Sequence, residues 1–146
     1  MEVQSTRFGC VGFAAEDPIR FGEGLPGLRA CRDWLVLADG RNPALAWLQS
    51  VDRPEVALAV VHPRRYVPRY QLRVARQELE PLELDDLRAA RVLAIVTKGP
   101  RSVALNLKAP LVINVDRRLG RQVIANGPLP VQYELPNTVA GCRRIA

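Results

Sequence analysis

The sequence predicts a mainly β protein, built as a small antiparallel β-barrel-like domain with one or two short helices. Short apolar or alternating runs follow one another about every ten residues, and Gly, Pro, Asn and Asp separate them. Helix-like spacing of Leu is confined to one window, residues 77–90. A chain of 146 residues has the length of one domain with a single core.

The first part of the chain is predicted to form a turn, a strand and a hairpin. Three Gly and one Pro crowd into residues 22–27, which indicates a tight turn. Residues 28–34 are expected to make one helical turn, and the apolar run Trp34–Ala38 a buried strand. Two apolar runs, 44–51 and 56–62, flank the charged sequence DRPE and predict a β-hairpin.

The middle of the chain is predicted to leave the sheet. Residues 63–70 contain two prolines, which exclude a central strand and favour an edge or loop segment. Residues 71–75 alternate between polar and apolar side chains. The window 77–90 is the most acidic of the chain and predicts one or two short helices, interrupted before Pro81.

The last part of the chain returns to strands. Residues 91–97 form the strongest buried-strand pattern, and residues 102–108 and 110–115 read as strands interrupted at Pro110. Residues 116–120 indicate a turn, 121–125 the returning strand, and 126–135 one more short strand. The domain is therefore expected to span residues 1–136, with residues 137–146 as a flexible C-terminal tail.

Composition and charge bound the function. The chain is 48% apolar and 25% charged, with a net charge of +6, which excludes disordered, collagen-like and membrane-spanning classes. The excess of Arg favours acidic partners or reflects a general compositional preference for Arg. The three Cys residues lack the spacing of a disulfide framework or a zinc site, and no leader or membrane-length apolar run is present. A soluble cytoplasmic protein without metal or cofactor is expected.

No catalytic motif occurs in the sequence. His62 is the single histidine; it is either a base paired with Asp52 or Cys31, or an exposed residue at a strand end. The glycine-rich turn lacks the Lys-Ser/Thr of a phosphate loop. The sequence PRRYVPRY, residues 63–70, either stacks on a nucleic-acid strand or protects a sheet edge. The acidic window either is a solvated face or grips an Arg-rich partner.

Four blocks, taken in order, resemble the FliW family of flagellar assembly factors. They are RFGEGLPGL, AWLQSVDRPEVALAVV, RVLAIVT and NLKAPLVINVDRRLGRQVI, and the similarity covers about residues 6 to 135. The resemblance implies a cytoplasmic, non-enzymatic β-barrel-like protein. It also implies a partner switch, in which flagellin and the RNA-binding translational repressor CsrA exclude each other, and capture of CsrA restores flagellin synthesis.

The resemblance also assigns roles to residues. Gly24, Leu25, Pro26 and Gly27 match the family's turn, with a structural role. In the middle block, Gln49 and Asp52 either face a partner or hold the turn. Strand alternation is expected to send the polar residues of the late block outward, while Leu105, Leu107, Val112 and Ile124 fill the core. Ordinary solvation and turn hydrogen bonding remain the alternative. The expected partner-binding residues are Gln49, Asp52, Asn106, Lys108, Asn114, Arg118 and Gln122.

Charge is the main departure from this family, whose members tend to be acidic. The chain has His62, Arg64–Arg65–Tyr66 and Arg69 where many relatives carry acidic or aromatic residues. The acidic residues within 78–86 remain the place where a basic repressor is attracted. Two other functions compete with protein binding. An enzyme would use His62 and Asp52, and a basic nucleic-acid-binding β-barrel would use Arg64, Arg65, Arg69, Arg117, Arg118 and Arg121.

Overall fold

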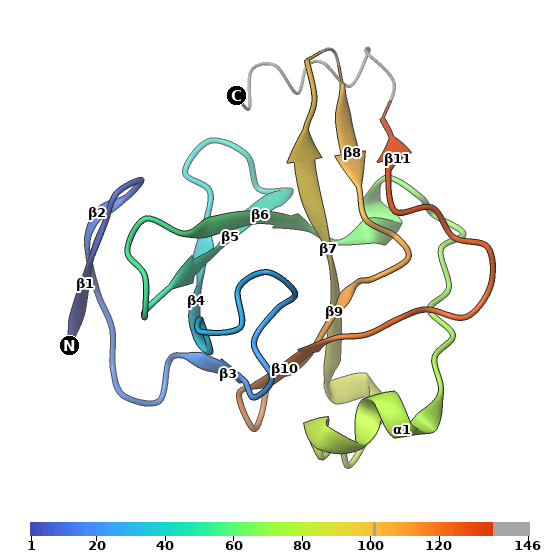
Figure 1. The fold of residues 1–146 in the computed structure, drawn as a ribbon, viewed down its shortest axis with the longest axis horizontal. Helices are drawn as coiled ribbons and strands as arrows, with labels where there is room; N and C mark the ends of the chain where they lie inside the picture. Colours follow the sequence, from blue (N-terminus) through green and yellow to red (C-terminus); the bar gives the residue numbers. More distant parts are fainter. Residues whose placement is uncertain (101, 136–146) are drawn as a thin grey trace.

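A computed structural model describes residues 1–100 and 102–135 of the chain (Figure 1). Its strands are β1 (Glu2–Ser5), β2 (Gly9–Gly12), β3 (Ile19–Phe21), β4 (Asp33–Ala38), β5 (Leu45–Ser50), β6 (Ala57–Val61), β7 (Ala90–Lys98), β8 (Val103–Leu105), β9 (Leu111–Asn114), β10 (Leu119–Gln122) and β11 (Tyr133–Glu134). One short α-helix, α1 (Arg76–Leu79), and three 3₁₀ turns, η1 (Pro63–Arg65), η2 (Glu80–Leu82) and η3 (Leu87–Ala89), complete it.

Seven strands close into a barrel. They follow the order β7–β6–β5–β4–β3–β10–β9, and β9 pairs back onto β7. Neighbouring strands are antiparallel except β3 and β10, which are parallel. The mainly β, barrel-like fold predicted from the sequence is confirmed.

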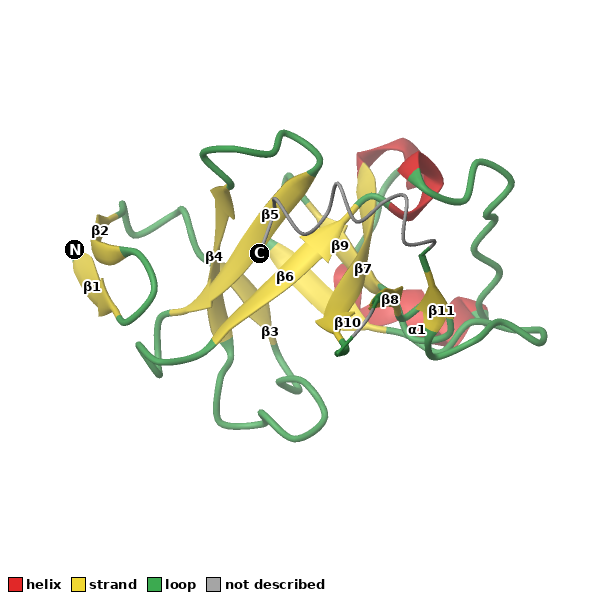
Figure 2. Cartoon of the chain, turned by 90° about the horizontal axis from the view of Figure 1, so that it is seen from above, coloured by secondary structure: helices red, strands yellow, loops and turns green. Residues whose placement is uncertain are grey.

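The strand β7 belongs to two sheets. Its first half, Ala90–Leu93, pairs with β9 in the barrel, and its second half pairs with β8 at Val96–Lys98. The strand β8 then pairs with β11. Figure 2 shows β8 and β11 at one end of the molecule and the hairpin β1–β2 at the other.

The barrel interior is filled by the inward-facing apolar side chains of its strands. Phe21, Trp34 and Leu48 are fully buried there, together with Leu111 and Ile113. Gly120 on β10 leaves room for the aromatic ring, because an added Cβ would lie 2.5 Å from Phe21 Cζ. Gly120, the first residue of the GRQ sequence in the motif, is therefore required for packing against Phe21.

Two further apolar clusters lie outside the barrel wall. Tyr70, Leu105 and Leu107 belong to one, beneath the segment that leads from η1. Leu82, Val112 and Val123 form the other, beneath the acidic window. Because of this outer layer, strand β9 is buried on both faces, and all four of its residues are buried.

The hairpin β1–β2 was not predicted, because its strands are short and rich in small or polar residues. Side chains of the adjoining turn attach it to β5: the Phe8 ring stacks edge-on against Trp47, with centroids 5.7 Å apart, and the Arg7 guanidinium lies 4.3 Å from the Trp47 ring centroid. The Trp47 indole N–H also donates to Asp39 at 3.0 Å, and this bond is the main reason that the pKa of Asp39 is lowered.

The helical turn predicted at residues 28–34 is wrong. Two consecutive turns span residues 25–31, with the Leu28 N–H donating to the Leu25 carbonyl at 2.8 Å and the Cys31 N–H to the Leu28 carbonyl at 3.0 Å, and β4 begins at Asp33. The preceding glycine turn is tight, because Gly24 has φ +67° and lies against the backbone of Arg29. The predicted flexible tail, 137–146, lies outside the described residues.

Candidate functional site

Gln49 is an internal brace of the β5–β6 hairpin. Its side chain is fully buried. The amide nitrogen lies within hydrogen-bond distance of the carbonyl oxygens of Ser50, Pro54 and Val56, at 2.9, 3.1 and 3.2 Å. The amide oxygen accepts a 2.6 Å bond from the Ser5 hydroxyl on β1. Of the two roles expected for Gln49, facing a partner or holding the turn, these bonds support the second, because its amide satisfies the turn and the N-terminal hairpin together.

Asp52 joins the same turn to the start of β4. One carboxylate oxygen accepts from the backbone N–H of Arg32 at 2.9 Å and of Asp33 at 3.1 Å. Asp52 itself is exposed. These bonds hold residues 32–33 in the extended conformation and explain why no helical turn forms there.

The NLKAP sequence is a set of local staples. The Asn106 side-chain oxygen accepts from the Ala109 N–H at 2.9 Å. The Lys108 ammonium donates to the carbonyl oxygens of Ala125 and Gly127, both at 2.7 Å. Gln122 donates from its amide to the Ala109 carbonyl at 2.9 Å. The three side chains are half-buried. Asn106 bonds within the β8–β9 connection, Gln122 joins that connection to β10, and Lys108 joins it to the chain that follows β10.

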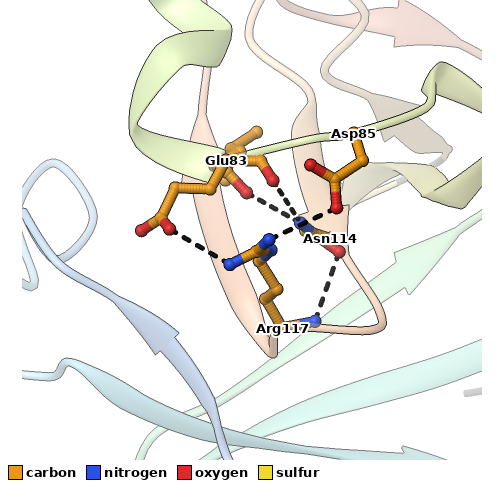
Figure 3. A network of polar contacts seen from close by, with 5 residues as sticks. Glu83, Asp85, Asn114 and Arg117 are labelled. Carbon is orange, nitrogen blue, oxygen red and sulfur yellow. Dashed lines mark hydrogen bonds and ion pairs between the residues drawn. The ribbon is translucent and has the colours of Figure 1, made fainter.

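Asn114 connects β9 to the acidic window (Figure 3). Its amide nitrogen donates to the carbonyl oxygens of Leu82 at 2.8 Å and Glu83 at 3.3 Å, and its oxygen accepts from the Arg117 N–H at 3.3 Å. Only 2% of Asn114 is exposed. The prediction of an outward Asn114 is wrong for a physical reason: the acidic window covers this face of β9, so the strand has no solvent side.

Arg118 is one of the two exposed residues among the seven expected to bind a partner. It is exposed and has φ +55°, at the turn between β9 and β10. Its carbonyl accepts a 2.8 Å bond from the Arg20 N–H, which helps to join β10 to β3. A non-glycine residue in the left-handed region costs free energy, so the turn is held by its surroundings.

Ile124 is not a core residue, contrary to prediction. Strand β10 ends at Gln122, and Val123 and Ala125 then turn inward while Ile124 points out with 56% of its surface exposed. Leu105, Leu107 and Val112 are buried as predicted. Side chains therefore still alternate between buried and exposed after residue 122, but Val123 and Ala125, and not Ile124, are the buried ones.

The acidic window is largely neutralised by the chain's own Arg residues. Arg117 reaches Glu83 and Asp85, both at 3.3 Å (Figure 3). Arg121 reaches Glu78 at 3.0 Å and Glu23 at 3.3 Å. Arg88 pairs with Asp86 at 2.9 Å, and this bond with the Arg88 side chain is the main cause that lowers the pKa of Asp86. The window is thus clamped to β10 and to the β9–β10 turn.

The groups of the two rival functions are not brought together. His62 follows β6 and Asp52 precedes it, so the length of that strand, roughly 16 Å, separates them. Cys31 is buried beside the Asp52 end. Of the six Arg residues, Arg117 and Arg121 are ion-paired. Arg117 is on the β9–β10 turn and Arg121 on β10, and this part of the barrel lies apart from η1 in Figure 1. Within the described ranges, no group of three or more His, Cys, Asp or Glu is placed to hold a metal ion.

Sequence reasoning missed Ser5, Trp47 and Arg117 as organising residues. Arg117 follows Asn114 by three positions, the spacing at which an Asn side chain accepts from a turn N–H, and this signal was available. Ser5 contacts Gln49 at a separation of 44 positions, and Trp47 contacts Phe8 near the start of the chain; no local pattern predicts such contacts.

These features define a small β-barrel protein whose polar motif residues hold its loops and outer layer together. None of the helices in the described part of the chain is long and apolar enough to span a membrane.

Comparison with known proteins identifies the family. The FliW protein family model matches residues 2–135. The flagellar assembly factor FliW of Bdellovibrio bacteriovorus is 36% identical over 126 residues, covering 85% of this chain and 72% of the relative. That of Magnetococcus marinus is 32% identical, covering 95% and 88%. A crystal structure of the flagellar assembly factor FliW matches with a TM-score of 0.87 at 27% identity, covering 94% of this chain and 99% of that chain. The chain belongs to the FliW family of flagellar assembly factors.

Proposed function

We propose that this protein is a cytoplasmic flagellar assembly factor that acts by binding, without catalysing a reaction. It binds flagellin and, in exchange, binds and antagonises the translational repressor CsrA, which relieves repression of flagellin synthesis. The observation that carries the proposal is the match to the FliW family over residues 2–135, together with the matching fold.

The exchange follows from mass action. When flagellin occupies the protein, CsrA stays free and represses; when flagellin is consumed, the protein is released and captures CsrA. The two partners either share one surface or bind two sites that are negatively coupled. In both cases the binding of each lowers the apparent affinity for the other.

The seven expected contact residues divide into three groups by exposure. Arg118 and Asp52 are exposed, and we propose Arg118 as a direct contact. Gln49 and Asn114 are buried and support binding only by holding the β5–β6 turn and the acidic window in place. Asn106, Lys108 and Gln122 are half-buried, and their polar ends are engaged with backbone groups.

The test mixes the purified protein with the flagellin and the CsrA of the same cell, separately and together, and follows complexes by size-exclusion chromatography with light scattering. We expect a complex of defined stoichiometry with each, and displacement of CsrA by added flagellin. Failure to form a complex with either protein would refute the proposal. A complex with both at once, without displacement, would refute the exchange.

A further inference from the structure

The segment between η1 and α1 carries charge of a single sign. From Glu55 to Glu78 the chain has no other carboxylate side chain, and it places five Arg residues in that interval. All five are exposed, and none forms an ion pair with a described residue. We call this set the basic strip; it consists of Arg64, Arg65, Arg69, Arg73 and Arg76.

The backbone of the basic strip is fixed. The Arg64 guanidinium donates to the Tyr70 carbonyl at 2.9 Å, and the Tyr70 hydroxyl donates to the Leu107 carbonyl at 2.9 Å. The Asn126 N–H donates to the Arg73 carbonyl at 2.6 Å. Apolar neighbours such as Leu72 pack inward while the Arg side chains face out. A partner that docks here does not have to order the backbone first, which reduces the cost of binding.

An exposed apolar side chain lies beside the basic strip. Ile124 is held there because its N–H donates to Glu78 at 3.2 Å, and two residues later Asn126 is bonded to Arg73. Glu78 does not cancel the charge of the strip, since Arg121 already pairs with it at 3.0 Å. An exposed apolar group bordered by Arg residues is the composition of a protein-binding surface.

The aromatic residues of this segment do not favour nucleic acid. Single-stranded nucleic acid stacks its bases on exposed aromatic rings. Tyr70 is only 5% exposed, and burial raises its pKa. Tyr66 packs against the same outer apolar cluster. The basic strip therefore offers positive charge and an aliphatic contact, without a stacking platform.

We propose that the basic strip, with Ile124 beside it, is a docking surface for an acidic segment of a protein partner, in which carboxylates face the Arg side chains and an apolar residue covers Ile124. The proposal rests on the proposed function in taking the partner to be a protein.

Two double variants test the proposal. The strip variant is Arg69→Glu with Arg73→Glu, and the matched control is Arg29→Glu with Arg32→Glu. All four side chains are exposed, and each variant changes the net charge by the same amount. Affinities for flagellin and for CsrA are measured by titration calorimetry at low and at physiological salt, and circular dichroism verifies folding. A third variant, Ile124→Ser, tests the apolar contact.

For at least one of the two partners, we expect the strip variant to lose roughly tenfold or more in affinity at low salt, while the control changes by about twofold or less. The loss should shrink as salt rises. Ile124→Ser should weaken the same complex with little change in its salt dependence. Equal losses in strip and control variants for every partner bound would overturn the proposal.

A synthetic probe separates this proposal from the proposed function. If the wild-type protein binds neither flagellin nor CsrA, the proposed function fails, and a fluorescein-labelled peptide of alternating Glu and Leu then decides on the strip. Weaker peptide binding by the strip variant than by the control supports the docking surface, and equal binding overturns it. Tighter binding of a labelled oligouridine than of the peptide, lost in the strip variant, would overturn it in favour of a nucleic-acid surface.

Discussion

Two neighbouring segments of the chain carry dense charge, and the structure treats them in opposite ways. In the acidic window, carboxylates meet Arg117 and Arg121 and become part of the outer layer. In the basic strip, the Arg residues are exposed, and none of them forms an ion pair with a described residue. Charge density alone therefore does not mark a binding surface. Charge that the chain already compensates is structural, and charge left uncompensated is available to a partner.

The largest expected effect comes from Asn114→Ala, which tests whether the acidic window is clamped. The substitution leaves the Leu82 carbonyl without its donor in a buried place and removes a partly buried bond to the Glu83 carbonyl, and should lower the free energy of unfolding by about 2–3 kcal/mol. Urea unfolding measures the loss. The control is Arg118→Ala, an exposed change at the same turn, with an expected effect below about 0.5 kcal/mol. Equal losses would mean that Asn114 does not hold the window.

Gly120→Ala tests the barrel wall beneath the clamped window. The new methyl group would lie 2.5 Å from the Phe21 ring, so the core must shift, and we expect a loss of about 1–3 kcal/mol. Gly40→Ala is the control, because nothing lies within 4 Å of the added carbon. Thermal unfolding of both variants measures the difference. A stable Gly120→Ala protein would show that the wall yields.

A pair of Arg substitutions tests the contrast between the ion-paired acidic window and the basic strip. Arg121 is 22% exposed at its side chain, and its removal leaves Glu78 without its ion-pair partner, so Arg121→Ala should cost about 1 kcal/mol. Arg73→Ala should change stability by less than about 0.5 kcal/mol, because Arg73 is exposed and unpaired among the described residues. If Arg73→Ala proves as destabilising as Arg121→Ala, the basic strip is structural and the contrast fails.

The smallest expected effect concerns Asp86 and pH. Its pKa is lowered in the folded state, mainly by the Arg88 side chain, so the carboxylate contributes stability above its unfolded pKa, near pH 4, and loses that contribution as pH falls through the folded value. Asp86→Asn should therefore be slightly less stable than wild type at neutral pH, with the two curves converging in acid. Denaturant midpoints measured across that range test it, and a constant difference would contradict it.

Strands with an apolar run between turn residues could be predicted from sequence. Residues 34–38 and the hairpin around DRPE match β4 and the β5–β6 pair, because burial and turn chemistry there are local properties. The β1–β2 hairpin could not, since its stability comes from Trp47 and Gln49, more than thirty residues away in the chain. Local sequence patterns therefore predict the fold class. They do not predict an element such as the β1–β2 hairpin, which is held by residues distant in the sequence.

The candidate site was harder to predict, because strand alternation assumes one solvent face. At β9 both faces are covered, so the prediction places Asn114 on a solvent side that the strand does not have. The direction of Ile124 depends on where β10 ends, and Gln122 gives no signal of that end. For the segment that we propose as a docking surface, the sequence predicts either a nucleic-acid contact or a protected sheet edge. Only the structure shows that none of its Arg residues forms an ion pair with a described residue.

The parallel pairing of β3 with β10 has a consequence for biosynthesis. Arg20 lies opposite Leu119, about a hundred residues later, so the barrel wall cannot close until the chain has been synthesised as far as β10. Until then the nascent chain exposes open strand edges. A partner that recognises the closed barrel therefore cannot bind the nascent chain before β10 has been synthesised.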